Sequence, residues 1–136
     1  MNKLELDKVL ALLSECAGSK EAKAACLRLY PVSDLDDVKA LLEETTAASD
    51  LCTRKGNPSF SGVSDVSASL ERAERGGSLN MAELLRVAGV LRCARNVKAY
   101  VAEDEEPTVL DTLFFMLTAN KYLEDHIFGA IISEEE

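Results

Sequence analysis

Apolar residues recur at helical spacing along nearly the whole chain. Leu, Val and Ala return every three or four positions within each segment, and no segment alternates with period two for long enough to predict a strand. Ser, Thr, Asp, Asn, Gly and Pro separate the segments at positions where they can begin or end a helix. With their N-caps included, the predicted helices cover about residues 6–17, 19–30, 34–55, 64–75, 80–101, 108–117 and 122–131.

The predicted fold class is all-α, a single domain of about seven helices with antiparallel helical hairpins around a long central helix. A length of 136 residues suits one domain, because a chain of about 150 residues buries roughly 70% of its unfolded surface. The segment after Asn80 is the candidate for the central helix, since Val87, Val90 and Val97 widen its apolar stripe.

Residues 70–85 predict a corner between two helices. Gly76 can take the left-handed conformation that closes a helix, and Gly77 is the alternative position for this cap. Asn80 can cap the next helix while Glu83 reaches back in a capping box. We therefore predict that these four residues form a structural joint.

Two loops interrupt the helical pattern. In residues 56–62, Pro58 fixes a turn and Phe60 is the only large apolar side chain, so we expect Phe60 to anchor the loop in the core. Residues 103–106 are all acidic and precede Pro107, which predicts a solvated loop.

The charge balance disfavours nucleic-acid binding by this chain alone. Fifteen Lys and Arg stand against 24 Asp and Glu, which gives a formal net charge of −9, and such a field repels phosphate backbones. The first residues lack the apolar region of a signal peptide, and no apolar run approaches the roughly 20 residues of a membrane span. We expect a cytoplasmic location and no membrane partner.

No pattern predicts a catalytic, cofactor or metal site. The single histidine, His126, has no second His and no nearby Cys to complete a metal site. The acidic runs at 34–37 and 103–106 lack the glycine and ligand spacing of a calcium loop. The cysteines form no Cys-x-x-Cys pair and are predicted to be reduced core residues; they are Cys16, Cys26, Cys52 and Cys93.

A local cluster of positive charge lies on the predicted long helix: Arg86, Arg92, Arg95 and Lys98. At about 100° per residue these side chains spread over more than half of the helix circumference. They therefore do not form one narrow stripe. Salt bridges to the surplus carboxylates are the favoured interpretation, and a weak nucleic-acid or partner contact is the alternative.

Four motifs in order carry a family resemblance. They are LELDKVL at 4–10, P-x-x-D-x-x-x-V-x-x-L-L-E-E-T at 31–45, P-x-x-x-G-V-x-D-V at 58–66 and L-x-R-A-x-x-G-G-x-L-x-x-x-E-L-L at 70–85. By these motifs the chain resembles the amino-terminal region of the MutS-II family, the bacterial MutS paralogues with a carboxy-terminal Smr domain. The resemblance is strong to about Ala94 and covers nearly the whole chain.

The resemblance implies a fragment of a larger protein. The parent would be a dimeric, DNA mismatch repair-like ATPase that uses ATP and Mg and acts on branched DNA or stalled ribosomes, with endonuclease activity in its Smr domain. Residues 1–136 would be a helical core and lever segment, and their partners would be the remaining core, clamp and ATPase domains. No residue here matches the family's Walker A motif, so we assign no ATP-binding or nuclease residue.

Two functional hypotheses follow. In the first, the chain is a structural core or lever segment that couples the ATPase state to the nucleic-acid clamp and is not itself catalytic. Gly76 and Gly77 would fix the angle between two of its helices. In the second, the chain is a stand-alone helical module that docks a protein partner through its long helix. Both hypotheses predict that the isolated chain exposes apolar surface, because the protein that would cover this surface is missing from it.

Overall fold

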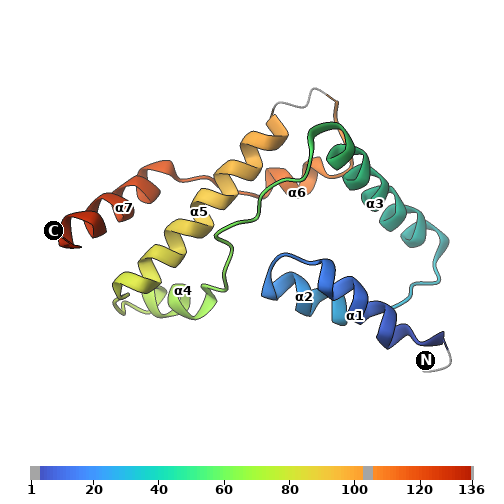
Figure 1. Cartoon of the computed structure of the whole chain (residues 1–136), viewed down its shortest axis with the longest axis horizontal. Coiled ribbons are helices and arrows are strands. Elements are labelled where there is room, and N and C mark those ends of the chain that lie inside the picture. The colour runs from blue at the N-terminus through green and yellow to red at the C-terminus, as the bar shows by residue number, and fades with distance from the viewer. Residues whose placement is uncertain (1–3, 103–105, 136) are drawn as a thin grey trace.

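The computed structural model describes residues 4–102 and 106–135, and these form seven helices and no strand. The helices are α1 (Leu6–Cys16), α2 (Lys20–Leu27), α3 (Leu35–Lys55), α4 (Ser67–Glu74), α5 (Met81–Ala102), α6 (Asp111–Phe115) and α7 (Lys121–Glu135). The predicted all-α fold is confirmed. The single domain is elongated, with α1 and α2 at one end and α7 at the other (Figure 1).

Helices α2 and α3 begin at their predicted N-caps. The hydroxyl of Ser19 accepts a hydrogen bond from the backbone N–H of Ala22 at 3.1 Å, which opens α2. One carboxylate oxygen of Asp34 accepts from the backbone N–H groups of Asp36 and Asp37 at 3.0 and 3.1 Å, which opens α3. Each cap satisfies donors that the first turn of a helix leaves without a partner.

Other helix ends differ from the prediction. Ser64 does not cap α4: its hydroxyl is a buried atom without a hydrogen-bond partner, and α4 begins later, at Ser67. The backbone N–H of Ser67 instead donates to the carboxylate of Asp65 at 3.0 Å, and hydrogen bonds from Ser67 lower the pKa of Asp65. Helix α2 ends at Leu27, before the predicted end at Tyr30. Most of the predicted acidic loop, residues 103–105, lies outside the described residues.

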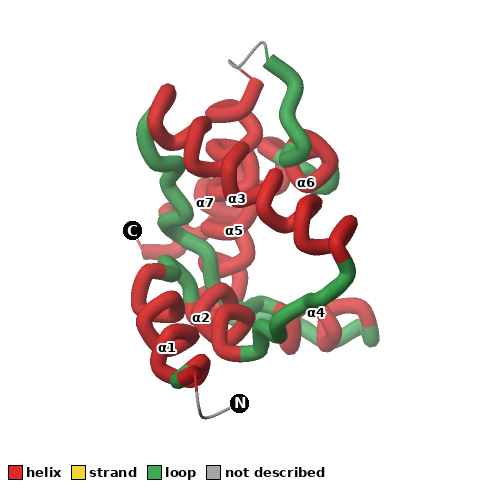
Figure 2. The backbone as a smooth tube through the Cα atoms, turned by 90° about the vertical axis from the view of Figure 1, so that its right-hand side faces the viewer, coloured by secondary structure: helices red, strands yellow, loops and turns green. Residues whose placement is uncertain are grey.

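The hairpin of α1 and α2 packs mainly within itself. The two helices contact each other, and the Ser14 hydroxyl donates to the carbonyl of Lys23 at 3.2 Å. Neither helix has a buried residue. A view along the long axis shows the hairpin below α3 (Figure 2), and Figure 1 shows the hairpin apart from α7.

Helix α5 is the centre of the other half of the molecule. It contacts both α6 and α7, and the end of α3 is joined to it by polar bonds. Lys55 donates to the carbonyl of Tyr100, and the Tyr100 hydroxyl donates to the carbonyl of Gly56 at 2.6 Å. The Lys55 ammonium also lies 5.0 Å from the centre of the Tyr100 ring. The terminal turn of α3 is therefore fixed to α5.

The loop of residues 56–62 is attached to α5 by its backbone, and the predicted anchor is wrong. Phe60 is 54% exposed. Gly62, at φ 91°, instead crosses Gly89 of α5 so closely that a Cβ on Gly62 would lie 3.0 Å from the Gly89 carbonyl oxygen. The buried thiol of Cys93 approaches the carbonyl of Ser59 at 3.8 Å. Backbone contact at paired glycines therefore holds the loop where an aromatic side chain was expected.

The core is confined to the α5 half of the molecule. Among the residues whose burial the structure describes, the buried apolar ones are Leu51, Ala88, Cys93, Val97, Leu110, Ile127 and Ile131. Between residues 4 and 50, no residue is buried. Cys93 is thus the one cysteine fully inside the core, as predicted, whereas Cys16 is exposed and contradicts the prediction. All four cysteines are free thiols.

Candidate functional site

The helix corner closes α4 with a Schellman motif. The backbone N–H of Gly76 donates to the carbonyl of Ala73 at 3.0 Å, and that of Gly77 donates to the carbonyl of Arg72 at 2.8 Å. Gly76 has a φ of 85°, in the left-handed region that a glycine enters without a Cβ penalty. Of the two candidate glycines, Gly76 is therefore the left-handed cap.

Gly77 is required at the corner for a different reason. A Cβ at Gly77 would lie 2.6 Å from Cγ and 2.9 Å from the backbone oxygen of Arg72, whereas a Cβ at Gly76 would meet nothing within 4 Å. The two glycines thus meet two separate demands, conformation at Gly76 and space at Gly77.

The predicted capping box opens α5. The backbone N–H of Glu83 donates to the Asn80 side-chain oxygen at 2.9 Å, and the backbone N–H of Asn80 donates to the Glu83 carboxylate at 2.9 Å. Arg72 of α4 also donates to this carboxylate. The Arg72 bond, followed by the Asn80 bond, lowers the pKa of Glu83. Glu83 therefore joins the end of α4 to the start of α5.

The basic residues of α5 do not act as one cluster. Arg92 and Arg95 both bind Glu124 of α7, with Arg92 Nε 3.2 Å and Arg95 Nη2 2.9 Å from its Oε1. Arg86 is exposed and its Nε donates to the carbonyl of Ala82 in its own helix at 3.4 Å. Lys98 is also exposed, on the α5 surface near α6. The structure thus brings together two of the four residues, and it pairs them with a carboxylate.

Glu124 is the residue that sequence patterns failed to single out. Its side chain is 2% exposed, and Arg92 also lies over the ring of Phe128 at 4.1 Å. The hydrogen bond from Arg95 is the main cause that lowers the pKa of Glu124, against the opposing effect of burial. One signal was present in the sequence: Glu124 lies on the same helical face as Ile127 and Ile131, where a carboxylate needs a partner.

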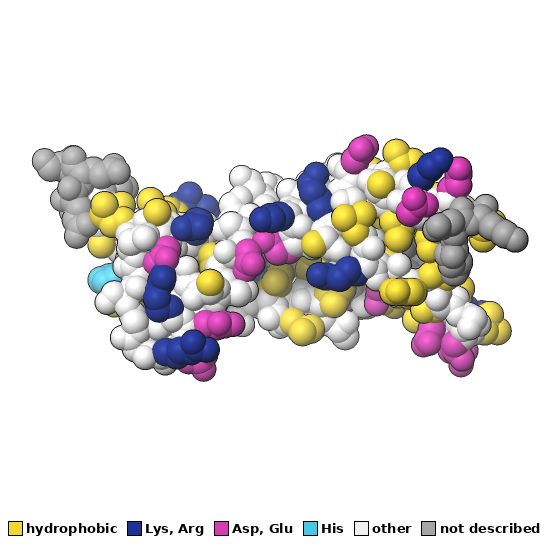
Figure 3. All heavy atoms as spheres, turned by 90° about the horizontal axis from the view of Figure 1, so that it is seen from below, with side chains coloured by type: hydrophobic (Ala, Val, Ile, Leu, Met, Phe, Trp, Pro, Cys, Tyr) yellow, Lys and Arg dark blue, Asp and Glu magenta, His cyan; other side chains and the backbone are white. Residues whose placement is uncertain are grey.

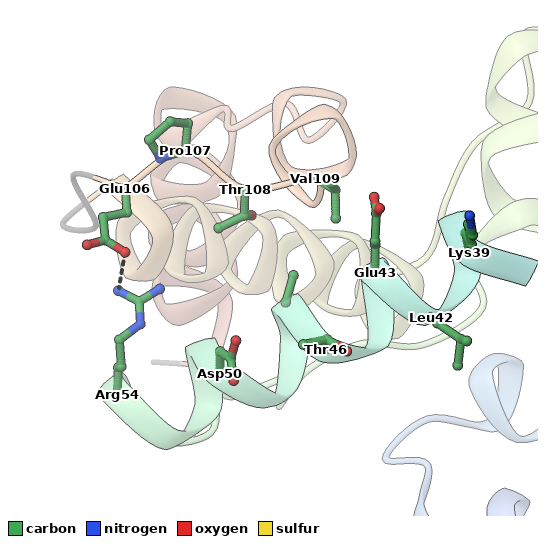
Figure 4. A pocket seen from close by; sticks show the side chains of 11 residues that line it. Lys39, Leu42, Glu43, Thr46, Asp50, Arg54, Glu106, Pro107, Thr108 and Val109 are labelled. Atoms are coloured by element: carbon green, nitrogen blue, oxygen red, sulfur yellow. Dashed lines mark ion pairs between the residues drawn. The ribbon is translucent and has the colours of Figure 1, made fainter. Parts of the chain in front are cut away.

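An open groove lies between α3 and the segment 106–109, with a volume of about 810 Å³. One continuous face of α3 forms a wall from Lys39 to Arg54, and Glu106 closes one end through an ion pair with Arg54 at 4.0 Å. Figure 4 shows Glu43 and Asp50 extending from α3 on the side of this segment. Apolar side chains are exposed in the groove, with Leu42 at 60% and Val109 at 45%.

Large apolar side chains also remain exposed along the α1–α3 region. We define the uncovered apolar surface as Leu12, Leu27, Leu29, Tyr30, Leu35 and Leu41, each of which is more than half exposed. The total accessible surface is 10316 Å², well above the about 7,000 Å² expected for a compact monomer of this mass. Figure 3 shows many hydrophobic side chains toward the end of the molecule that holds α1 and α2.

The described residues show no cluster of metal-ligating side chains. Within the parts of the chain that the structure describes, no three His, Cys, Asp or Glu side chains gather as a metal site. His126 is exposed and stacks on Tyr122 with ring centres 6.0 Å apart. Among these same residues, no helix combines the length and apolar character that crossing a bilayer needs.

Comparison with known proteins relates the chain to part of a longer bacterial protein. No protein-family model matches the sequence. Proteins named Endonuclease MutS2 are 37% identical in Acetivibrio thermocellus, 38% in Ruminiclostridium cellulolyticum and 39% in Clostridium perfringens. Each alignment covers 98% of this chain, which spans only 17% of the length of these curated relatives. The chain is therefore related to a segment of Endonuclease MutS2.

Proposed function

We propose that the chain is a structural core or lever segment of a MutS-family protein, that it couples an ATPase to a nucleic-acid clamp, and that it is not itself catalytic. The relationship to a segment of Endonuclease MutS2 supports the placement in a longer protein. The open apolar surface supports a role that depends on packing against further domains.

The observation that carries this proposal is the absence of any buried residue between residues 4 and 50. Three helices with regular apolar stripes begin in this region, yet most of the Leu side chains that they carry before residue 51 are exposed. Helical stability in proteins comes mostly from packing of an apolar face. Further protein that covers this face would provide that packing.

The corner and the long helix support the lever part of the proposal. At about 1.5 Å per residue, α5 with its 22 residues is about 33 Å long. The Schellman motif, the capping box and Arg72 fix the chain at the start of this rod. A rod held at its end can transmit a displacement between two domains. We propose the joint role of Gly76, Gly77, Asn80 and Glu83 on this basis.

We extend the proposal to the longer protein. It would be a cytoplasmic homodimer that binds ATP with Mg in its ATPase domain and acts on branched DNA or ribosomes. The name of the relatives supports an endonuclease activity in that protein. Because Arg92 and Arg95 already bind Glu124, we place nucleic-acid contacts in other domains rather than on this segment.

The proposal is tested by reconstitution. The Clostridium perfringens relative is expressed without the segment that matches this chain, and the two polypeptides are mixed and passed over a size-exclusion column. We expect a stoichiometric complex that no longer binds a hydrophobic dye. Failure to form a complex would contradict the proposal and favour a stand-alone interaction module.

A second measurement tests the proposal that this chain is not itself catalytic. Calorimetry of the isolated chain at moderate salt is expected to show no binding of ATP and little binding of branched DNA. Binding of ATP at micromolar affinity would contradict the assignment of the nucleotide site to another domain.

A further inference from the structure

We propose that the groove between α3 and the segment 106–109 is the docking site for one amphipathic helix from the rest of the longer polypeptide, with basic residues two turns apart. This inference rests on the proposed function and names the partner at one defined place. It follows from the shape of the groove, from its exposed apolar residues and from the spacing of its acidic residues.

The groove has the dimensions of a helix-binding surface. Its α3 wall runs from Lys39 to Arg54, which is about 22 Å at the helical rise of about 1.5 Å per residue. A helix of about four turns matches this length. The second wall, Glu106–Val109, stands opposite the same stretch of α3 (Figure 4). A groove open along its side accepts a polymer segment better than a small molecule, which needs an enclosing pocket.

The middle of the groove is suited to an apolar side chain. Thr46 and Ala47 form this part of the α3 wall and are small enough for a second helix to come close. Leu42 and Val109 lie on either side of the groove and are largely exposed. The docking helix would cover both of them with an apolar face.

The acidic residues of the groove indicate where the docking helix carries positive charge. Glu43 and Asp50 are exposed and line the α3 wall of the groove, and among the described residues no ion pair joins either carboxylate to a cation. They are seven residues apart, so they lie about 10 Å from each other along one side of α3. Lys or Arg residues at positions i and i+7 of the docking helix would face these two carboxylates. Two cations share this wall: Arg54 pairs with Glu106, and Lys39 lies one turn before Glu43.

Reconstitution with charge-reversed variants tests this inference. The probe is the Clostridium perfringens relative without its matching segment, and its dissociation constant is measured by calorimetry. The variant Glu43→Lys with Asp50→Lys should bind at least about tenfold more weakly, because like charges would meet in the groove. The matched control is Glu71→Lys with Glu74→Lys on α4, which makes the same change in net charge at exposed positions and should bind within about twofold of the parent chain.

A photo-crosslinking residue at Thr46 identifies the segment that occupies the groove. We expect cross-links to one helix with basic residues seven positions apart. Equal affinity of the two double variants would contradict the docking of a basic helix in this groove. Cross-links only to an acidic or non-helical segment would contradict it as well. Either result would leave the proposed function intact. If the unchanged chain does not bind the probe at all, both proposals fail. Circular dichroism of each variant shows whether its helices are intact.

Discussion

The carboxylate of Glu124 and the guanidinium of Arg95 form a two-pronged ion pair between α7 and α5. Arg95 Nε lies 3.0 Å from Oε2, and Arg95 Nη2 lies 2.9 Å from Oε1. The carboxylate is buried while the arginine is 36% exposed at its side chain. Because the planar guanidinium matches a carboxylate at two points, this pair fixes the orientation of α7 as well as its attachment.

Replacement of Glu124 by Gln should lower the free energy of unfolding by about 1–3 kcal/mol, because a buried group loses charge-assisted hydrogen bonds. Thermal or urea unfolding measures this change. Asp125→Asn is the control, since Asp125 is exposed and forms an ion pair with exposed Lys121, and such pairs contribute about 0–1 kcal/mol. Equal effects of the two variants would show that the buried pair does not stabilise α7.

The same carboxylate should make stability depend on pH. The pKa of Glu124 is lowered in the folded state, so the folded state binds this proton less readily than the unfolded state. The contribution is therefore present above the ordinary pKa of a glutamate, about 4.3, and is lost as the pH falls through the lowered value. We expect the difference in stability between the parent chain and Glu124→Gln to shrink on acidification below about pH 4. A difference that grows on acidification would contradict this assignment.

The two glycines of the corner should respond differently to substitution. At Gly76, Ala should cost about 1–2 kcal/mol because of the positive φ, and Asn should cost less because it tolerates the left-handed region. At Gly77 the limit is space beside Arg72, so Asn should be no better than Ala. Urea unfolding compares these variants with Gly18→Ala, where a Cβ meets nothing within 4 Å. Better tolerance of Asn at Gly77 than at Gly76 would reverse the two roles.

Two helical glycines provide a matched test of the loop crossing. Replacement of a glycine by Ala inside a helix normally raises stability by about 1 kcal/mol. Gly129→Ala in α7 should show this gain, because a Cβ there meets nothing within 4 Å. Gly89→Ala should gain less or become destabilising, since its Cβ would lie 3.2 Å from the carbonyl oxygen of Gly62. Equal gains in stability for the two variants, measured by thermal unfolding, would mean that the loop does not press against α5.

The isolated chain should associate with itself through the uncovered apolar surface. Light scattering is expected to show a mass that rises with concentration, and a hydrophobic dye should bind. Replacing Leu12 and Leu41 by Asp should lower both signals, because each side chain is more than half exposed. A strict monomer at high concentration that binds no dye would contradict this expectation.

Local features of the fold were predictable from sequence because the interacting groups are near one another in the chain. The caps at Ser19 and Asp34 join residues two or three positions apart. The Schellman motif at Gly76 and the capping box at Asn80 are equally local. Their donors and acceptors meet whenever the helix forms, whatever else the chain does.

Contacts between distant segments were decided only by the tertiary structure. Glu124 meets Arg95 across 29 positions, and Gly62 meets Gly89 across a loop and a helix. Periodicity shows which face of each helix is apolar, but it does not show which other segment that face meets. For the same reason Phe60 was expected in the core and lies exposed. The sequence alone determined seven helices and their ends at the strongest caps, whereas packing decided the buried ion pair, the glycine crossing and the groove beside α3.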